Sequence, residues 1–124
     1  MYVDSGATET VLPEDCLESV ETIEGRESKR GVMYEVANGT RIANLGEKKF
    51  KGISKEGVAK MVTAQVCDVN KGLLSVRQMV KSGHRVVFDE EEAYIEDKRS
   101  GEKMWLTDTG GMYALKLWVK SMGF

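Results

Sequence analysis

Residues 1–8 of the chain read MYVDSGAT: a methionine, two strand-forming side chains, an aspartate and then four small residues. Tyr2 and Val3 favour a short extended segment, because aromatic and β-branched side chains are enriched in strands. Gly6 allows the backbone to turn sharply beside the acid. The stretch therefore predicts a strand that ends in a carboxylate on a tight loop, which is either an ordinary strand-end turn or the position of a reactive Asp4.

The composition is that of one domain of ordinary size. The 124 residues are 41% hydrophobic and 31% charged, which is enough for a single modest core. The formal net charge of -2 comes from 18 basic and 20 acidic residues and argues against a nucleic-acid partner. Short basic pairs such as Lys48-Lys49 are expected to be solvated. No apolar run approaches the roughly 20 residues of a membrane span, so no membrane partner is expected.

Cysteine and histidine are scarce, which limits the possible chemistry. Cys16 and Cys67 make no disulfide framework, so a reducing, cytoplasmic (intracellular) location is expected. The single histidine, His84, and the two cysteines have no neighbouring metal ligands in the sequence. We therefore predict no metal site and no cofactor.

Most of the chain after residue 30 has the pattern of short β-strands. Asn38-Gly39 lies between strand-like segments within residues 32–45, and this dipeptide predicts a hairpin with a type I′ turn. Apolar and polar side chains alternate over residues 58–66, as in a half-buried strand. Strands separated by turn signals predict a small β-barrel or sandwich. Further strands are expected at residues 85–88, 93–95, 103–106 and 113–119.

One short helix is expected to begin at Leu73 and to end before Gly83, which has the place of a C-cap. Leu73, Val76 and Val80 fall on one face at positions i, i+3 and i+7, with Leu74 beside them. These four side chains are predicted to lie in the core. The charged segment 12–30 is expected to contain one helical turn followed by a surface loop.

The segment Asp4-Ser5-Gly6-Ala7-Thr8 resembles the active-site signature of retropepsin-type aspartic proteases, in which apolar residues lead into Asp-Ser/Thr-Gly-Ala. The chain is most similar to the protease-like β-barrel of copia-type retrotransposon Pol polyproteins. That family's order is Asp-Ser-Gly-Ala, Val-Ala-Asn-Gly, Leu-Leu-Ser-Val, Gly-x-x-Val-x-Phe and a final Leu-Tyr-x-Leu-like strand. Here the corresponding segments are residues 4–7, 36–39, 73–76, 83–88 and 112–115.

The resemblance implies an all-β, retropepsin-like closed barrel over residues 1–124, with one short helix in its C-terminal half. It implies an aspartic-type endopeptidase of a retrotransposon, with Asp4 as the catalytic residue. The implied active-site loop is Ser5, Gly6, Ala7 and Thr8, with the Ser5 hydroxyl tying the two loops of a dimer together. The implied substrate-binding flap is Ala37, Asn38 and Gly39.

An aspartic protease needs two carboxylates about 3 Å apart that share one proton. Asp108-Thr109-Gly110-Gly111 is the other candidate signature in the chain. Its lead-in is poorly apolar, Gly111 replaces the usual small Ala or Ser, and two complete lobes do not fit in one chain of this size. We expect an ordinary hairpin turn there. The second carboxylate is therefore expected from Asp4 of a second copy, in a C2 homodimer.

Only Met1-Tyr2-Val3 precede Asp4, whereas retropepsins carry a dimer strand and a first strand there. The domain is therefore expected to lack its N-terminal strand or strands, which leaves an exposed sheet edge. The predicted activity is hydrolysis of peptide bonds in the chain's own polyprotein. The alternative is a catalytically inactive barrel that serves as an assembly or peptide-binding module. A nucleic-acid-associated module of the transposon is disfavoured by the near-neutral charge.

Overall fold

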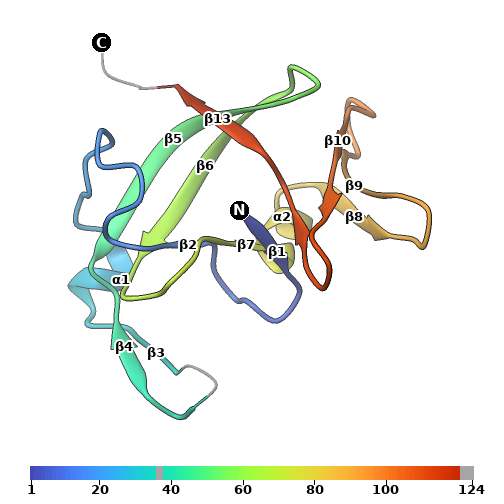
Figure 1. Ribbon diagram of the computed structural model, residues 1–124. Coiled ribbons are helices and arrows are strands. Elements are labelled where there is room, and N and C mark those ends of the chain that lie inside the picture. The colour runs from blue at the N-terminus through green and yellow to red at the C-terminus, as the bar shows by residue number, and fades with distance from the viewer. Residues whose placement is uncertain (36–37, 121–124) are drawn as a thin grey trace.

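The computed structural model describes residues 1–35 and 38–120, and these form mostly β-structure with two short helices (Figure 1). A single helical turn is present within residues 12–30, but it is α1 at the end of the segment, so the predicted order of a turn followed by a loop is wrong. The elements are β1 (Tyr2–Asp4), β2 (Val11–Leu12), α1 (Arg26–Lys29), β3 (Met33–Glu35), β4 (Arg41–Ala43), β5 (Gly46–Ser54), β6 (Ala59–Val66), β7 (Leu73–Ser75), α2 (Val76–Lys81), β8 (His84–Phe88), β9 (Ala93–Asp97), β10 (Lys103–Trp105), β11 (Thr107–Asp108), β12 (Tyr113–Ala114) and β13 (Leu117–Lys120).

Eight strands form one mixed sheet in the order β11-β12-β1-β7-β2-β6-β5-β13. Strand β1 lies parallel to β7, with Asp4 in register with Ser75. The longest pair, β5 and β6, is antiparallel, and β13 extends it on the far side of β5. Because β11 and β13 are the two ends of this sheet, the sheet is open. The predicted closed barrel is therefore not found among the described residues.

Two smaller sheets flank the main one. Strands β10, β9 and β8 form an antiparallel sheet that lies at the right of Figure 1. Strands β3 and β4 form a separate hairpin that projects at the lower left. The hairpin therefore projects from the body of the molecule (Figure 1).

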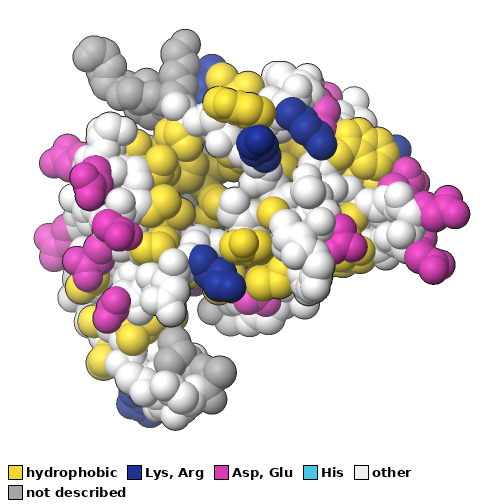
Figure 2. Space-filling view, in the orientation of Figure 1, with side chains coloured by type: hydrophobic (Ala, Val, Ile, Leu, Met, Phe, Trp, Pro, Cys, Tyr) yellow, Lys and Arg dark blue, Asp and Glu magenta, His cyan; other side chains and the backbone are white. Residues whose placement is uncertain are grey.

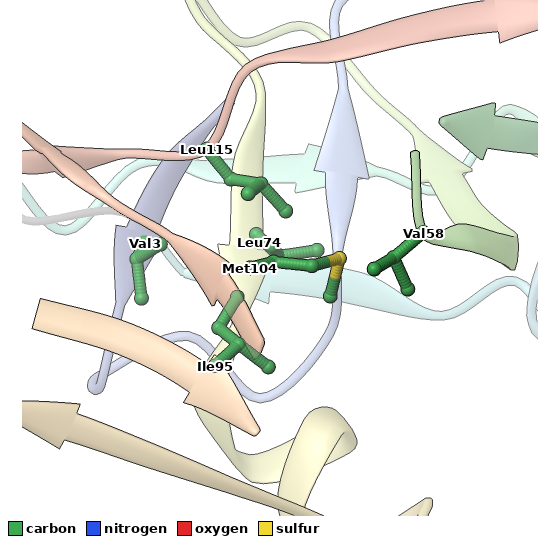
Figure 3. Close-up of a cluster of buried hydrophobic side chains, with 6 residues drawn as sticks. All are labelled: Val3, Val58, Leu74, Ile95, Met104 and Leu115. Atoms are coloured by element: carbon green, nitrogen blue, oxygen red, sulfur yellow. The ribbon is translucent and has the colours of Figure 1, made fainter. Parts of the chain in front are cut away.

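The main core joins the eight-stranded sheet to the three-stranded sheet. Six buried side chains from both sheets and the segments beside them form it, and they point toward one another in Figure 3. Fully burying one such side chain contributes about 1.5–3 kcal/mol, so this cluster holds the two sheets together. The six are Val3, Val58, Leu74, Ile95, Met104 and Leu115.

The helix predicted from Leu73 begins three residues later. Residues Leu73–Ser75 form β7 instead, because their backbone pairs with β1 on one side and β2 on the other. Ser75 is the N-cap of α2, and Gly83, with φ of +86°, follows its C-cap Ser82. Leu74 is buried as predicted, but Val80 is 52% exposed, so its predicted place in the core is wrong.

The predicted β3–β4 hairpin is present, but its predicted turn type is wrong. Glu35 pairs with Arg41, so the connection is longer than two residues. A type I′ turn needs positive φ at both central positions. Gly39 has a positive φ, of +83°, but a two-residue loop at Asn38-Gly39 would place Glu35 opposite Ile42, whereas Glu35 pairs with Arg41. Asn38 instead accepts a hydrogen bond on Oδ1 from the Thr40 amide, at 2.9 Å.

The strand predicted over residues 113–119 is divided into β12 and β13. The two parts pair with different neighbours: β12 lies between β11 and β1, whereas β13 pairs with β5. The chain changes partners at Leu115 and Lys116. The alternating apolar and polar residues over 113–119 therefore form two strands in separate parts of the sheet rather than one continuous strand.

Lys48 is not solvated as predicted but is 2% exposed. It lies on the inward face of β5, where alternate residues are buried. Its Nζ donates hydrogen bonds to the carbonyl oxygens of Cys16 and Leu17, both at 2.8 Å. A buried ammonium group is tolerated here because these backbone carbonyls replace water.

In the described part of the chain, no helix has the length and apolarity needed to cross a membrane.

Candidate functional site

Asp4 is the last residue of β1, and its side chain is half-buried. Its Oδ1 accepts a hydrogen bond from the Gly6 amide at 2.8 Å, which closes a tight turn immediately after the strand. A Cβ atom added to Gly6 would lie 3.3 Å from the same oxygen. The glycine thus allows the backbone to pass close to the carboxylate.

The junction of β7 and α2 holds the loop that follows Asp4 through hydrogen bonds. The Ser75 hydroxyl donates to the Ala7 carbonyl oxygen at 2.7 Å and accepts from the Gln78 amide at 3.2 Å. The Ser75 amide donates to Thr10 Oγ1 at 3.0 Å. The Gln78 side chain donates to the Thr8 carbonyl oxygen at 2.9 Å. Three of these four hydrogen bonds tie residues 7–10, on the C-terminal side of Asp4, to the junction.

A groove of about 740 Å³ lies between this loop and the β3–β4 hairpin. Figure 2 shows the surface notched between the projecting hairpin and the body of the molecule. The predicted loop and the predicted hairpin, far apart in the sequence, thus line one groove. The loop side consists of Asp4, Gly6, Ala7, Thr8 and Glu9, the hairpin side of Met33, Tyr34, Glu35 and Ile42, and the remainder of Val11, Cys67, Val69 and Leu73.

A buried polar network anchors the base of the hairpin to the main sheet. Asn44 Nδ2 donates to the Tyr34 hydroxyl at 2.9 Å and to Gln65 Oε1, on β6, at 2.8 Å. Asn44 Oδ1 accepts from the Gly46 amide at 2.8 Å. Burial raises the pKa of Tyr34, so the phenol stays protonated at neutral pH. The wall of the groove that carries Tyr34 is therefore held in a defined position.

Two other groups in the groove have shifted acidity. Burial, reinforced by the charge of Glu27, raises the pKa of the Glu9 carboxyl, while Lys81 opposes the shift. Burial and the Asp68 charge raise the pKa of the Cys67 thiol. Because only the thiolate is a strong nucleophile, Cys67 is not suited to covalent catalysis. The carboxyl groups are the reactive groups that this groove offers.

Other predicted site residues lie outside the groove. Ser5 is exposed and does not line it, and none of the hydrogen bonds described for residues 1–35 and 38–120 involves its side chain. Asn38 and Gly39 are exposed in the connection between β3 and β4, and the groove is lined by the strands of the hairpin instead. Ala37 lies outside the described residues.

Four residues of the site were not predicted from the sequence: Ser75, Gln78, Glu9 and Tyr34. Ser75-x-x-Gln78 has the spacing of a capping box, which marks a helix start and would have placed the beginning of α2 at Val76. In the structure the Gln78 side chain bonds to Thr8 rather than to the cap. Glu9 and Tyr34 carry no such local signal, because their place in the groove depends on the tertiary fold.

The second aspartate signature forms the predicted hairpin turn. The Thr109 amide donates to the Met112 carbonyl oxygen at 2.9 Å, and Gly110 has φ of +89°. Asp108 is exposed and aligns across β12 with Val3, through the pairs Asp108–Tyr113 and Tyr113–Val3. Residues aligned across a sheet share a face, and neighbours along a strand alternate. Asp108 and Asp4 therefore point to opposite faces, so they do not form a dyad within one chain.

No group of three or more His, Cys, Asp or Glu side chains that could hold a metal ion occurs within residues 1–35 and 38–120.

No protein-family model, no curated protein and no solved structure matches the chain.

Proposed function

We propose that the chain is one subunit of a retropepsin-like aspartic endopeptidase of copia-retrotransposon type, which cleaves peptide bonds of a polyprotein. The observation that carries the proposal is the groove that has Asp4 and its loop on one wall and the β3–β4 hairpin on the other. A groove between a carboxylate-bearing loop and a projecting hairpin suits an extended peptide. The hairpin would act as the flap over that peptide.

The proposed reaction uses Asp4 from each of two copies of the chain. Two carboxylates about 3 Å apart cannot both ionise easily, so they share a proton and titrate as a pair. The ionised Asp4 takes a proton from a water molecule, which attacks the scissile carbonyl carbon. The protonated Asp4 donates its proton to the carbonyl oxygen, which gives a tetrahedral diol. The C–N bond then breaks, the leaving nitrogen takes the proton that the first Asp4 had removed from water, and the second Asp4 recovers its proton from a diol hydroxyl as the carboxylic acid product forms. No metal ion or covalent intermediate takes part.

The local structure supports this role in two ways. Asp4 lies at the end of a strand that is paired on both sides, by β12 and by β7. The loop after it is tied to Ser75 and Gln78. A catalytic side chain must be held within a fraction of an ångström of its working position, and such supports provide that rigidity.

The proposal is tested by peptide hydrolysis at mildly acidic pH with the wild-type chain and with Asp4→Asn. We expect pepstatin-sensitive cleavage that falls by at least about 100-fold in Asp4→Asn, because the amide cannot exchange the shared proton. Asp108→Asn is the matched control, and its activity should stay near that of the wild type. Sedimentation should show a dimer at the concentrations that are active. Cleavage that survives in Asp4→Asn, or an active monomer, contradicts the proposal.

A second candidate function is a non-catalytic module that binds peptides. Its supporting observation is that a single aspartate lines the groove among the described residues, so one chain alone lacks a dyad. If the folded wild type and Asp4→Asn bind a peptide equally and neither cleaves it, this second function is correct.

A further inference from the structure

The groove beside Asp4 has a one-sided charge. Its charged lining residues are Asp4, Glu9 and Glu35, and among the described residues no lysine, arginine or histidine lines it. Arg41, which pairs across the hairpin with Glu35, is exposed and is not part of the lining. Because the walls of a groove exclude part of the solvent, acids within it act together on a bound ligand.

Glu9 is the member of this set that is best placed to meet a ligand. It is half-buried on the loop that begins at Asp4. Burial and the neighbouring Glu27 penalise its negative charge more than Lys81 stabilises it, so the pKa of Glu9 is raised. A cation bound beside Glu9 would remove that penalty, because an opposite charge stabilises the ionised carboxyl. Glu35 lies across the groove on β3 and can act on the same cation or on a second one.

Apolar side chains occupy the rest of the groove. Met33, on β3, is 52% exposed, which is a large exposure for a hydrophobic residue at a concave surface. Ile42 lies on the same hairpin, and Leu73 lies across from it on β7. A ligand side chain laid against these residues would remove apolar surface from water and stabilise binding by about 25 cal/mol for each Å² covered.

We infer that the groove selects extended peptides in which a lysine or arginine lies close to an apolar side chain, with Glu9 and Glu35 as the residues that determine the basic preference. This inference rests on the proposed function and adds its substrate class. The apolar side chain packs against Ile42 and Leu73, and the basic side chain reaches the carboxylates of the two glutamates.

The test compares peptides that share one apolar centre and differ at a flanking residue, which is Lys, Gln or Glu. With the wild-type chain at pH 6 and low salt, we expect kcat/KM for the Lys peptide to exceed that for the Gln peptide by about fivefold. The Glu peptide should be the poorest substrate. The preference should shrink as salt is added, because mobile ions screen the charges.

Glu9→Gln combined with Glu35→Gln should bring the Lys-to-Gln ratio close to one. Glu91→Gln, in the exposed turn between β8 and β9, is the matched control and should keep the wild-type ratio. A ratio that is unchanged in the double variant, or equal cleavage of all three peptides by the wild type, overturns the inference while the proposed activity stands.

Binding to the Asp4→Asn chain, measured by fluorescence anisotropy with the same peptides, separates the two proposals. If the wild type cleaves nothing but the Lys peptide binds several-fold more tightly than the Glu peptide, the substrate class is supported and the proposed activity fails. If no peptide is cleaved and none binds, or all bind equally, the inference is overturned.

Discussion

At the scale of single residues, Ser75 connects three parts of the site. It is 0% exposed, and its hydroxyl both donates to Ala7 and accepts from Gln78. One hydroxyl therefore closes the loop after Asp4 and caps α2. Because the group is buried, no water can replace either partner if the hydroxyl is removed. Asp4 itself depends on this support, since it lies in register with Ser75 on the neighbouring strand.

Ser75→Ala should lower the free energy of unfolding by about 1–3 kcal/mol, because it removes an N-cap and leaves the Ala7 carbonyl without its donor. Urea denaturation measures the change. Ser82→Ala is the control, since Ser82 is exposed at the end of α2 and its loss should cost no more than about 0.5 kcal/mol. Equal losses in the free energy of unfolding for the two substitutions would contradict the role of the Ser75 hydroxyl in holding the loop after Asp4.

At the scale of elements, the β3–β4 hairpin is attached to the main sheet chiefly through polar contacts near Asn44. A two-stranded hairpin is only marginally stable by itself in water. The Asn44 side chain bridges Tyr34 of the hairpin and Gln65 of β6, and the Asn44 backbone amide donates to the Val32 carbonyl oxygen at 3.0 Å. The Asn44 side chain therefore supplies the side-chain link between this wall of the groove and β6.

Asn44→Ala should cost about 1–3 kcal/mol of stability, because Gln65 loses a buried partner. Amide hydrogen exchange should accelerate more in β3 and β4 than in β5 and β6, since the hairpin loses its attachment. Asn70→Ala, at an exposed position, is the control. Unchanged protection of residues 33–35 and 41–43 would contradict this account of how the hairpin is held.

At the scale of the whole molecule, the main sheet and the three-stranded sheet are joined by the apolar core and by one ion pair. Lys60, on β6, donates to Asp97 Oδ2 at the end of β9. Asp97 Oδ1 also accepts from the Arg99 and Ser100 amides. The hydrogen bond from Lys60, followed by those two amides, holds the pKa of Asp97 well below its usual range.

This shift predicts a pH-dependent contribution to stability. A carboxyl whose pKa is lowered by folding stabilises the protein above its unfolded pKa, about 4, and the contribution is lost as the pH falls through the folded value. Asp97→Asn should therefore lower the melting temperature at pH 7, and the difference from wild type should shrink below about pH 4. Glu102→Gln, an exposed acid nearby in the sequence, should show no such convergence. A difference that stays constant from pH 7 to pH 3 would contradict the role of the ion pair.

Local sequence signals predicted most of the strands and the turn at Asp4. Aromatic and β-branched residues next to Asp4 and Gly6 predict a strand and a turn, and Asn38-Gly39 predicts a hairpin, because the causes lie within a few residues. The prediction that the helix begins at Leu73 was wrong for a physical reason. Leu73 and Leu74 fit the apolar face of a helix, but pairing with β1 and β2 on both sides satisfies their backbone groups as a strand.

The sequence by itself determined the β-rich class, the acid on its tight turn and the hairpin, since each depends on backbone preferences of neighbouring residues. Only the tertiary structure decided that the sheet stays open, that Lys48 faces inward and that Glu9 and Tyr34 meet in the groove with Asp4. These features arise from contacts between distant segments, such as the bond from Ser75 to Ala7 across 68 positions of the chain. Short-range propensity carries no information about which distant segment will supply the partner.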